Sequence, residues 1–220
     1  TPTVVTPTAQ SLSSAEDDAY VGSISDPDNQ GVTITANQVT FDATDTIDAG
    51  SGIDTLAITN TAGNGGIMPA QLNGVENIQM TSYGASSIDL LVATGVEKVV
   101  SKGSTAADTF TNVQTLAAIE ANGSSSDLTV KYADSLMSGT DDTVSLTLST
   151  GADLANVVIQ GATAANVVET INIVSSGATA NAVNSILSNG VAIGTLDISG
   201  AANLTLGTGT AFSSGDVLAV

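Results

Sequence analysis

The stretch Gly74-Val75-Glu76-Asn77-Ile78 decides the fold of this chain, because it returns as Gly95-Val96-Glu97-Lys98-Val99. The step from Val75 to Val96 is 21 residues. Units of about 20 residues that each expose one aliphatic face are too small to fold alone, and stacking them buries a continuous core. The repeat therefore predicts a solenoid. Looser copies of the pattern lie at residues 112–116, 167–171 and 192–196.

Around these copies the chain alternates apolar and polar residues with a period of two, which predicts short β-strands. Clusters of Gly, Asn, Ser and Asp between the strands predict turns. One segment, residues 180–187, has apolar residues at helical spacing and predicts a helix. The strands are expected at residues 32–35, 39–41, 56–58, 78–80, 128–130, 144–148, 171–173, 196–198 and 204–206.

The composition favours an all-β, right-handed parallel β-helix or solenoid. Aromatic residues are only 3% of the chain while hydrophobic residues are 42%, so the core consists of Val, Ile, Leu and Ala, which suit a narrow coil interior. The alternative is a pair of tandem Ig-like β-sandwiches of about 100 residues each. We expect residues 1–31 to be a linker with an acidic N-terminal segment, and residues 32–220 to be the solenoid domain.

The charged residues exclude several classes of function. The chain has 22 acidic residues against 3 Lys, which gives a net charge of −19, and it contains no Arg, His or Cys. It therefore has no imidazole base, thiol nucleophile or guanidinium clamp. A surface this negative repels nucleic acid, and no apolar stretch is long enough for membrane insertion. Oxygen ligands remain, and these are the ligands that calcium prefers.

One nine-residue segment has the form of a calcium-binding turn. The segment at residues 49–57 fits the template G-G-x-G-x-D-x-hydrophobic-x, with Ala49 in the first Gly position. It resembles the nonapeptide of repeats-in-toxin proteins, in which tight Gly turns expose carbonyls to the ion. The resemblance implies that Asp54 is a side-chain ligand and that Ala49 and Ser51 offer carbonyls. Asp45 is the equivalent ligand one nonapeptide earlier, and a Gly-rich acidic turn without an ion is the alternative.

A second candidate calcium loop is Asp26-Pro27-Asp28-Asn29-Gln30-Gly31. Oxygen-bearing side chains at alternate positions, here Asp26 and Asp28, followed by Gly, match the opening of many calcium loops. A plain type I turn around Pro27 is the alternative.

Catalysis is not expected. A pair of carboxylates could serve a glycosidase, and parallel β-helices do host polysaccharide-degrading enzymes. Such clefts use aromatic and basic side chains to hold sugars, and this chain has only 3 Phe, 3 Tyr, no Trp and 3 Lys. We therefore predict that the protein is not an enzyme.

Together, the nonapeptide turn, the recurring Gly-Val-Glu units and the Lys-poor, Thr-, Ala-, Asn- and Gly-rich composition resemble calcium-dependent bacterial surface-layer (S-layer) proteins. The closest kind is the type I-secreted one related to repeats-in-toxin proteins. The resemblance implies an extracellular structural protein that assembles on the bacterial cell surface with calcium as the linking ion. Its partners would be further copies of the chain and cell-surface polysaccharide. The alternative is a repeat, stalk or ligand-binding segment of a large secreted adhesin.

Overall fold

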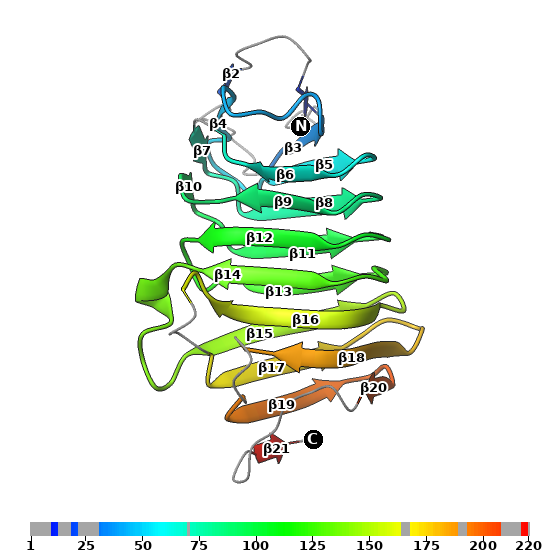
Figure 1. Cartoon of the computed structure of the whole chain (residues 1–220). Helices are drawn as coiled ribbons and strands as arrows, with labels where there is room; N and C mark the ends of the chain where they lie inside the picture. Colours follow the sequence, from blue (N-terminus) through cyan, green and yellow to red (C-terminus); the bar gives the residue numbers. More distant parts are fainter. Residues whose placement is uncertain are drawn as a thin grey trace, which may run out of the picture.

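The computed structural model describes residues 10–12, 19–21, 31–69, 71–163, 168–188, 193–207 and 217–219. These residues form a parallel β-solenoid of about seven turns, in which every strand pairing is parallel. Its strands lie in three sheets that run along the stack (Figure 1). The predicted β-solenoid is confirmed, and the Ig-like alternative, whose sheets are antiparallel, is wrong.

Sheet A extends along the whole stack. Its ten strands, in spatial order, are β1 (Gln10–Ser11), β3 (Thr33–Asn37), β5 (Thr55–Asn60), β8 (Asn77–Ser82), β11 (Lys98–Lys102), β13 (Ala118–Asn122), β15 (Thr143–Ser149), β17 (Thr170–Ser175), β19 (Thr195–Gly200) and β21 (Val217–Ala219).

Sheets B and C complete the coils. The four-stranded sheet B has the order β10 (Ala93–Thr94), β7 (Gln71–Asn73), β4 (Thr46–Asp48) and β2 (Ala19–Val21). The seven-stranded sheet C has the order β20 (Leu204–Leu206), β18 (Asn181–Leu187), β16 (Asp153–Gly161), β14 (Leu128–Tyr132), β12 (Asp108–Val113), β9 (Ser86–Asp89) and β6 (Asn64–Ile67).

The coils change shape along the axis. Sheet B ends at β10, so the N-terminal coils have three sides, and the later ones are built on sheets A and C. A short 3-10 helix, η1 (Asp134–Leu136), follows β14 and leads to Met137, which is buried against the core. Within the described ranges no helix is long and apolar enough to cross a membrane. Strands β1 and β2, from the segment expected to be a linker, pair with β3 and β4.

The core is a ladder of aliphatic side chains, one from each coil, facing inward from sheet A. Period-two alternation places every second residue of a strand inside, and the parallel register then puts equivalent residues of successive coils in contact. Each completely buried side chain of the ladder contributes about 1.5–3 kcal/mol, and Ile198 at its end is partly buried. The ladder consists of Ile34, Leu56, Ile78, Val99, Ile119, Leu146, Ile173 and Ile198.

The register confirms the repeat that decides the fold. Asn77 pairs with Lys98, a step of 21 residues, so Val75 and Val96 are equivalent buried residues. The described parts of the copies at 167–171 and 192–196 also lie in register, because Thr170 pairs with Thr195. The copy at 112–116 is out of register, since Lys98 pairs with Ala118 instead.

Two local predictions are wrong. Residues 39–41 form a turn, because the carbonyl of Asn37 accepts the amides of Thr40 and Phe41 at 3.1 and 3.0 Å. The segment predicted as a helix, residues 180–187, contains β18, which pairs with β16 and β20. Pairing on both edges of β18 outweighs the weak helical spacing, because tertiary context overrides local propensity.

Candidate functional site

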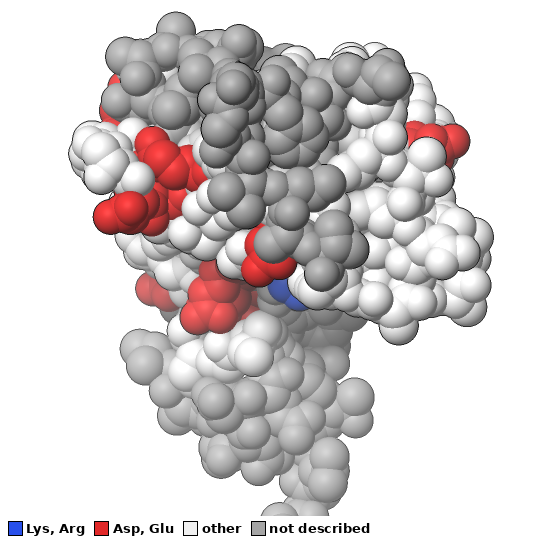
Figure 2. Space-filling view, turned by 90° about the horizontal axis from the view of Figure 1, so that it is seen from below, with Lys and Arg blue, Asp and Glu red and all other residues white. Residues whose placement is uncertain are grey.

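Acidic residues stand at the turn that leads into sheet A, and we call this turn the entry corner. An Asp or Glu directly precedes each of five sheet A strands, β5, β8, β11, β15 and β17. Seen from the C-terminal end, acidic residues are concentrated on one side of the solenoid (Figure 2). We call this set the entry-corner acids: Asp54, Glu76, Glu97, Asp142 and Glu169.

Several entry-corner acids hold neighbouring coils together. The Asp54 carboxylate accepts a hydrogen bond from the backbone amide of Val32, and the amide of Asp54 donates to Glu76 Oε2 at 2.7 Å. Further along, the amide of Asp142 donates to Glu169 Oε2 at 3.0 Å. In each case a carboxylate on one coil accepts a hydrogen bond from a backbone amide on the neighbouring coil. The residue that carries this amide directly precedes a sheet A strand. Glu76, in the first of the two Gly-Val-Glu units, therefore has a structural role.

The predicted nonapeptide turn has the expected backbone. Gly50 and Gly52 have φ values of 90° and 122°, a region that favours glycine. The amide of Ala49 donates to the carbonyl of Asn73 on the next coil at 2.9 Å. Ala49 is buried and Ser51 is half-buried. The turn is thus a tight, Gly-dependent corner that contacts the next coil.

The structure does not bring the two carboxylates of this prediction into one corner. Asp45 directly precedes β4 and Asp54 directly precedes β5, so strand β4 and the Gly turn lie between them. Both residues are buried, at 1% exposure. Asp45 Oδ2 accepts the amide of Asp42 at 2.8 Å. Asp26 and Asp28, the other predicted ligands, lie outside the described residues.

Asp42 lies in a loop, and its carboxylate accepts hydrogen bonds from within the same loop. Its Oδ1 accepts the amide of Thr44 at 2.7 Å and the Thr44 hydroxyl at 2.5 Å. The hydroxyl and the amide of Thr44 hold the pKa of the Asp42 carboxyl below its usual range.

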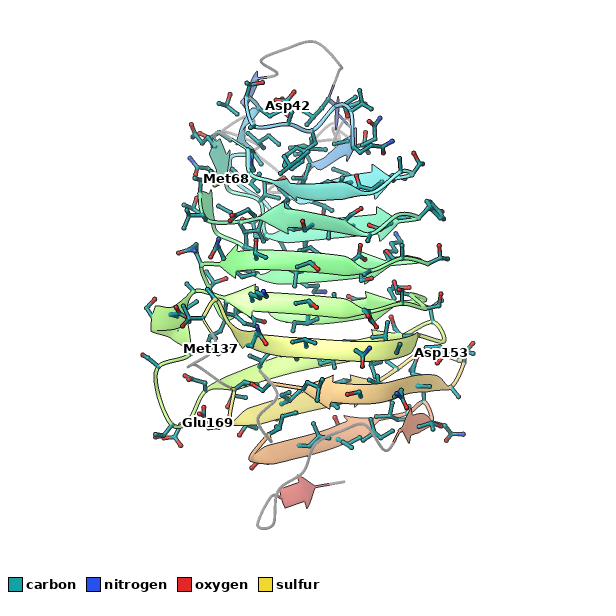
Figure 3. The ribbon with its side chains drawn as sticks, viewed as in Figure 1. Asp42, Met68, Met137, Asp153 and Glu169 are labelled. Carbon is teal, nitrogen blue, oxygen red and sulfur yellow. The ribbon has the colours of Figure 1, made fainter. Side chains whose placement is uncertain are left out.

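The carboxylates are spread along and around the coil rather than gathered. In Figure 3, Asp42 lies near the N-terminal end, Glu169 on the side of the entry corner and Asp153 on the opposite side. Among the described residues, no three Asp or Glu side chains come close enough together to hold a metal ion.

Two surface hollows show what the solenoid presents to solvent. One, of about 640 Å³, is lined by hydroxyl, amide and aliphatic groups of β3, the turn after it and β5, with no carboxylate. The other, of about 360 Å³, contains one carboxylate, that of Glu97. Glycoside hydrolysis uses a pair of facing carboxylates, and neither hollow holds such a pair.

The sequence reasoning missed a polar cluster inside the solenoid. It lies where the chain passes from sheet A to sheet C, and we call it the A–C corner cluster. It comprises one carboxyl and four hydroxyls, each at most 2% exposed, from Ser82, Ser101, Ser104, Asp108 and Ser124.

Hydrogen bonds join three successive coils in this cluster. Ser101 Oγ donates to Asp108 Oδ2 at 2.5 Å and lies 2.8 Å from Ser124 Oγ. The amide of Ser82 donates to Ser104 Oγ at 2.9 Å, and that of Ser104 to Ser124 Oγ at 3.1 Å. Burial raises the pKa of Asp108 above its ordinary value of 3.8, against the opposing effect of nearby serine hydroxyls.

The signal that could have found this cluster is Asp108-Thr109-Phe110, which has the same form as Asp54-Thr55-Leu56. Asp108 does not occupy the same place in its coil as Asp54. In sheet C, Asp108 pairs with Leu128, and Leu128 pairs with the buried Val157. Asp108 therefore occupies a position that carries core residues on the next two coils.

A second buried polar group lies at the same corner further along the stack. Asn181 donates through Nδ2 to Ser175 Oγ at 2.9 Å and to the carbonyls of Leu148 and Ser176 at 3.2 and 3.0 Å. Its Oδ1 accepts the amide of Ala152 at 2.9 Å. This side chain joins the coils of β15 and β17.

The fold and the corners define the class of the protein as a parallel β-solenoid repeat protein, an architecture compatible with proteins related to repeats-in-toxin. Comparison with known protein families, curated sequences and solved structures gives no match.

Proposed function

We propose that this chain is a structural module of an extracellular bacterial surface layer, whose lateral assembly is linked by calcium, and that it has no catalytic role. The observation that carries the proposal is the continuous ten-stranded sheet A with acidic residues stacked along one of its corners. A solenoid of this kind is a rigid, repetitive scaffold, because each coil packs on its neighbours. Its side surfaces are available for lateral contact.

The net charge of −19 provides the control of assembly. Negatively charged copies repel each other, and divalent cations that neutralise exposed carboxylates remove that repulsion. Extracellular calcium sites work at about 10⁻⁴–10⁻³ M. The buried hydrogen bonds of Asp54 favour a structural role for the nonapeptide turn. We therefore place the linking calcium on exposed carboxylates of the entry-corner side, such as Glu97 and Asp141.

The test is assembly as a function of calcium. We expect light scattering to rise between about 0.1 and a few mM calcium, electron microscopy to show sheets, and excess chelator to disperse them. The double variant Glu97→Gln/Asp141→Asn should need several-fold more calcium. Asp153→Asn, a change of the same kind on the opposite side of the coil, is the control. A chain that stays monomeric at these calcium concentrations contradicts the proposal.

A further inference from the structure

The A–C corner cluster contains a buried carboxyl group for which the proposed assembly has no use. Asp108 is 1% exposed, and its Oδ2 accepts the Ser101 hydroxyl at 2.5 Å. Its other oxygen, Oδ1, has no hydrogen-bond partner although it is fully buried. The hydroxyl of Ser82, which is also buried, lies near this carboxyl and opposes the rise of its pKa. The Asp108 carboxyl is therefore buried with a hydroxyl bond at one oxygen and with its other oxygen unpaired.

Charged side chains do not compensate this carboxyl. The charged side chains on the strands next to β12 occupy outward-facing, solvent-accessible positions. One of them, Lys98, is paired with Glu120 at 3.4 Å. Asp127, which precedes β14, accepts the amide and the side-chain amide of Asn156. The outward-facing charged residues are Asp89, Lys98, Lys102, Glu120 and Lys131.

We propose that Asp108 is a proton-binding site, at which a neutral carboxylic acid joins the coil of β8 to the coil of β11 and β12. A proton on Oδ1 removes the buried charge and lets this atom donate to the hydroxyl oxygen of the nearby Ser82. An isolated buried carboxylate is costly, and such groups become neutral instead. A metal ion is a poorer solution, because the cluster offers one carboxylate and hydroxyls only.

The proton makes the stability of the solenoid depend on pH. Burial raises the folded-state pKa of Asp108 above 3.8, so between the two values the folded chain binds a proton that the unfolded chain releases. Stability from this group is complete below the unfolded pKa and is lost as pH rises through the folded pKa. Within that window the unfolding equilibrium constant rises by up to about tenfold per pH unit. Acidification tightens the A–C corner.

The test compares urea unfolding of the wild-type chain and Asp108→Asn from pH 4 to pH 8. Asparagine keeps the shape and supplies a donor without a titrating proton. We expect the ratio of the two unfolding constants to change with pH by up to about tenfold per unit, with the wild type losing stability relative to the variant as pH rises. Asp89→Asn, the same change at an outward position of β9, should show no such divergence over the Asp108 window.

A direct measurement remains decisive even where Asp108→Asn fails to fold. The carboxyl carbon of Asp108 in the wild-type chain, followed by ¹³C NMR, should titrate well above the ordinary aspartate range. Titration near 3.8, or parallel pH profiles for the wild type and Asp108→Asn, overturns the proposal. The outcome is independent of calcium-linked assembly, because both measurements use the monomer.

Discussion

Thr150 is the residue whose replacement should stabilise this solenoid. It has a φ of 58°, in the left-handed region that β-branched residues rarely adopt. It lies in the turn between β15 and β16. The equivalent turn residues of the neighbouring coils are Gly123 and Gly177, with φ values of 64° and 95°. The chain thus uses glycine at this corner, and Thr150 is the exception.

The expected change in stability on replacing Thr150 by glycine is the difference between two opposing effects. The left-handed conformation costs a residue with a side chain about 1–2 kcal/mol. Glycine at the same place lowers the free energy of unfolding by about 0.5–1 kcal/mol, because it gives the unfolded chain more conformational entropy. Because the Thr150 side chain is exposed, little packing is lost. Thr150→Gly should therefore raise the free energy of unfolding by about 0.5–1 kcal/mol, and the melting temperature by about 1–4 °C for a chain of this size.

The assay is urea unfolding followed by circular dichroism, with thermal melting as a second measure. The matched control is Thr143→Gly, an exposed Thr in the regular strand β15, which should lose about 0.5–1 kcal/mol. Gly123→Ala should be destabilised by about 1–2 kcal/mol, because it introduces a side chain at a left-handed position. If Thr150→Gly loses as much stability as Thr143→Gly, the strain assigned to Thr150 does not exist.

Three further variants test the corners and the core by urea unfolding. Glu76→Ala removes the acceptor for the Asp54 amide and should cost about 1 kcal/mol; Glu76→Gln keeps an acceptor and should cost less, and an equal loss contradicts the hydrogen bond. Asn181→Ala removes four hydrogen bonds of a buried side chain and should cost about 2–3 kcal/mol; a loss below that of Glu76→Ala contradicts its linking role. Tyr132→Phe removes the 2.5 Å bond to the Ala117 carbonyl and should cost about 1 kcal/mol, whereas unchanged stability contradicts the contribution assigned to this bond.

The sequence by itself determined the architecture, because a parallel solenoid repeats one simple rule in every coil. Aliphatic residues at alternate positions must face inward, and Val75 and Val96 mark the same place in two successive units. That periodicity is local, so it can be read without knowing which strands pair. The sequence also located the Gly turn at residues 49–52, since left-handed backbone needs glycine.

Only the tertiary structure decided what each carboxylate does. Asp54 and Asp108 begin segments of the same local form, yet Asp54 stands at the entry corner and accepts a backbone amide, while Asp108 lies inside the coil beside serine hydroxyls. The difference comes from where each turn falls in the coil, which depends on the length of every preceding side. Burial and partners arise between coils that are distant in sequence, and so only stacking fixes them.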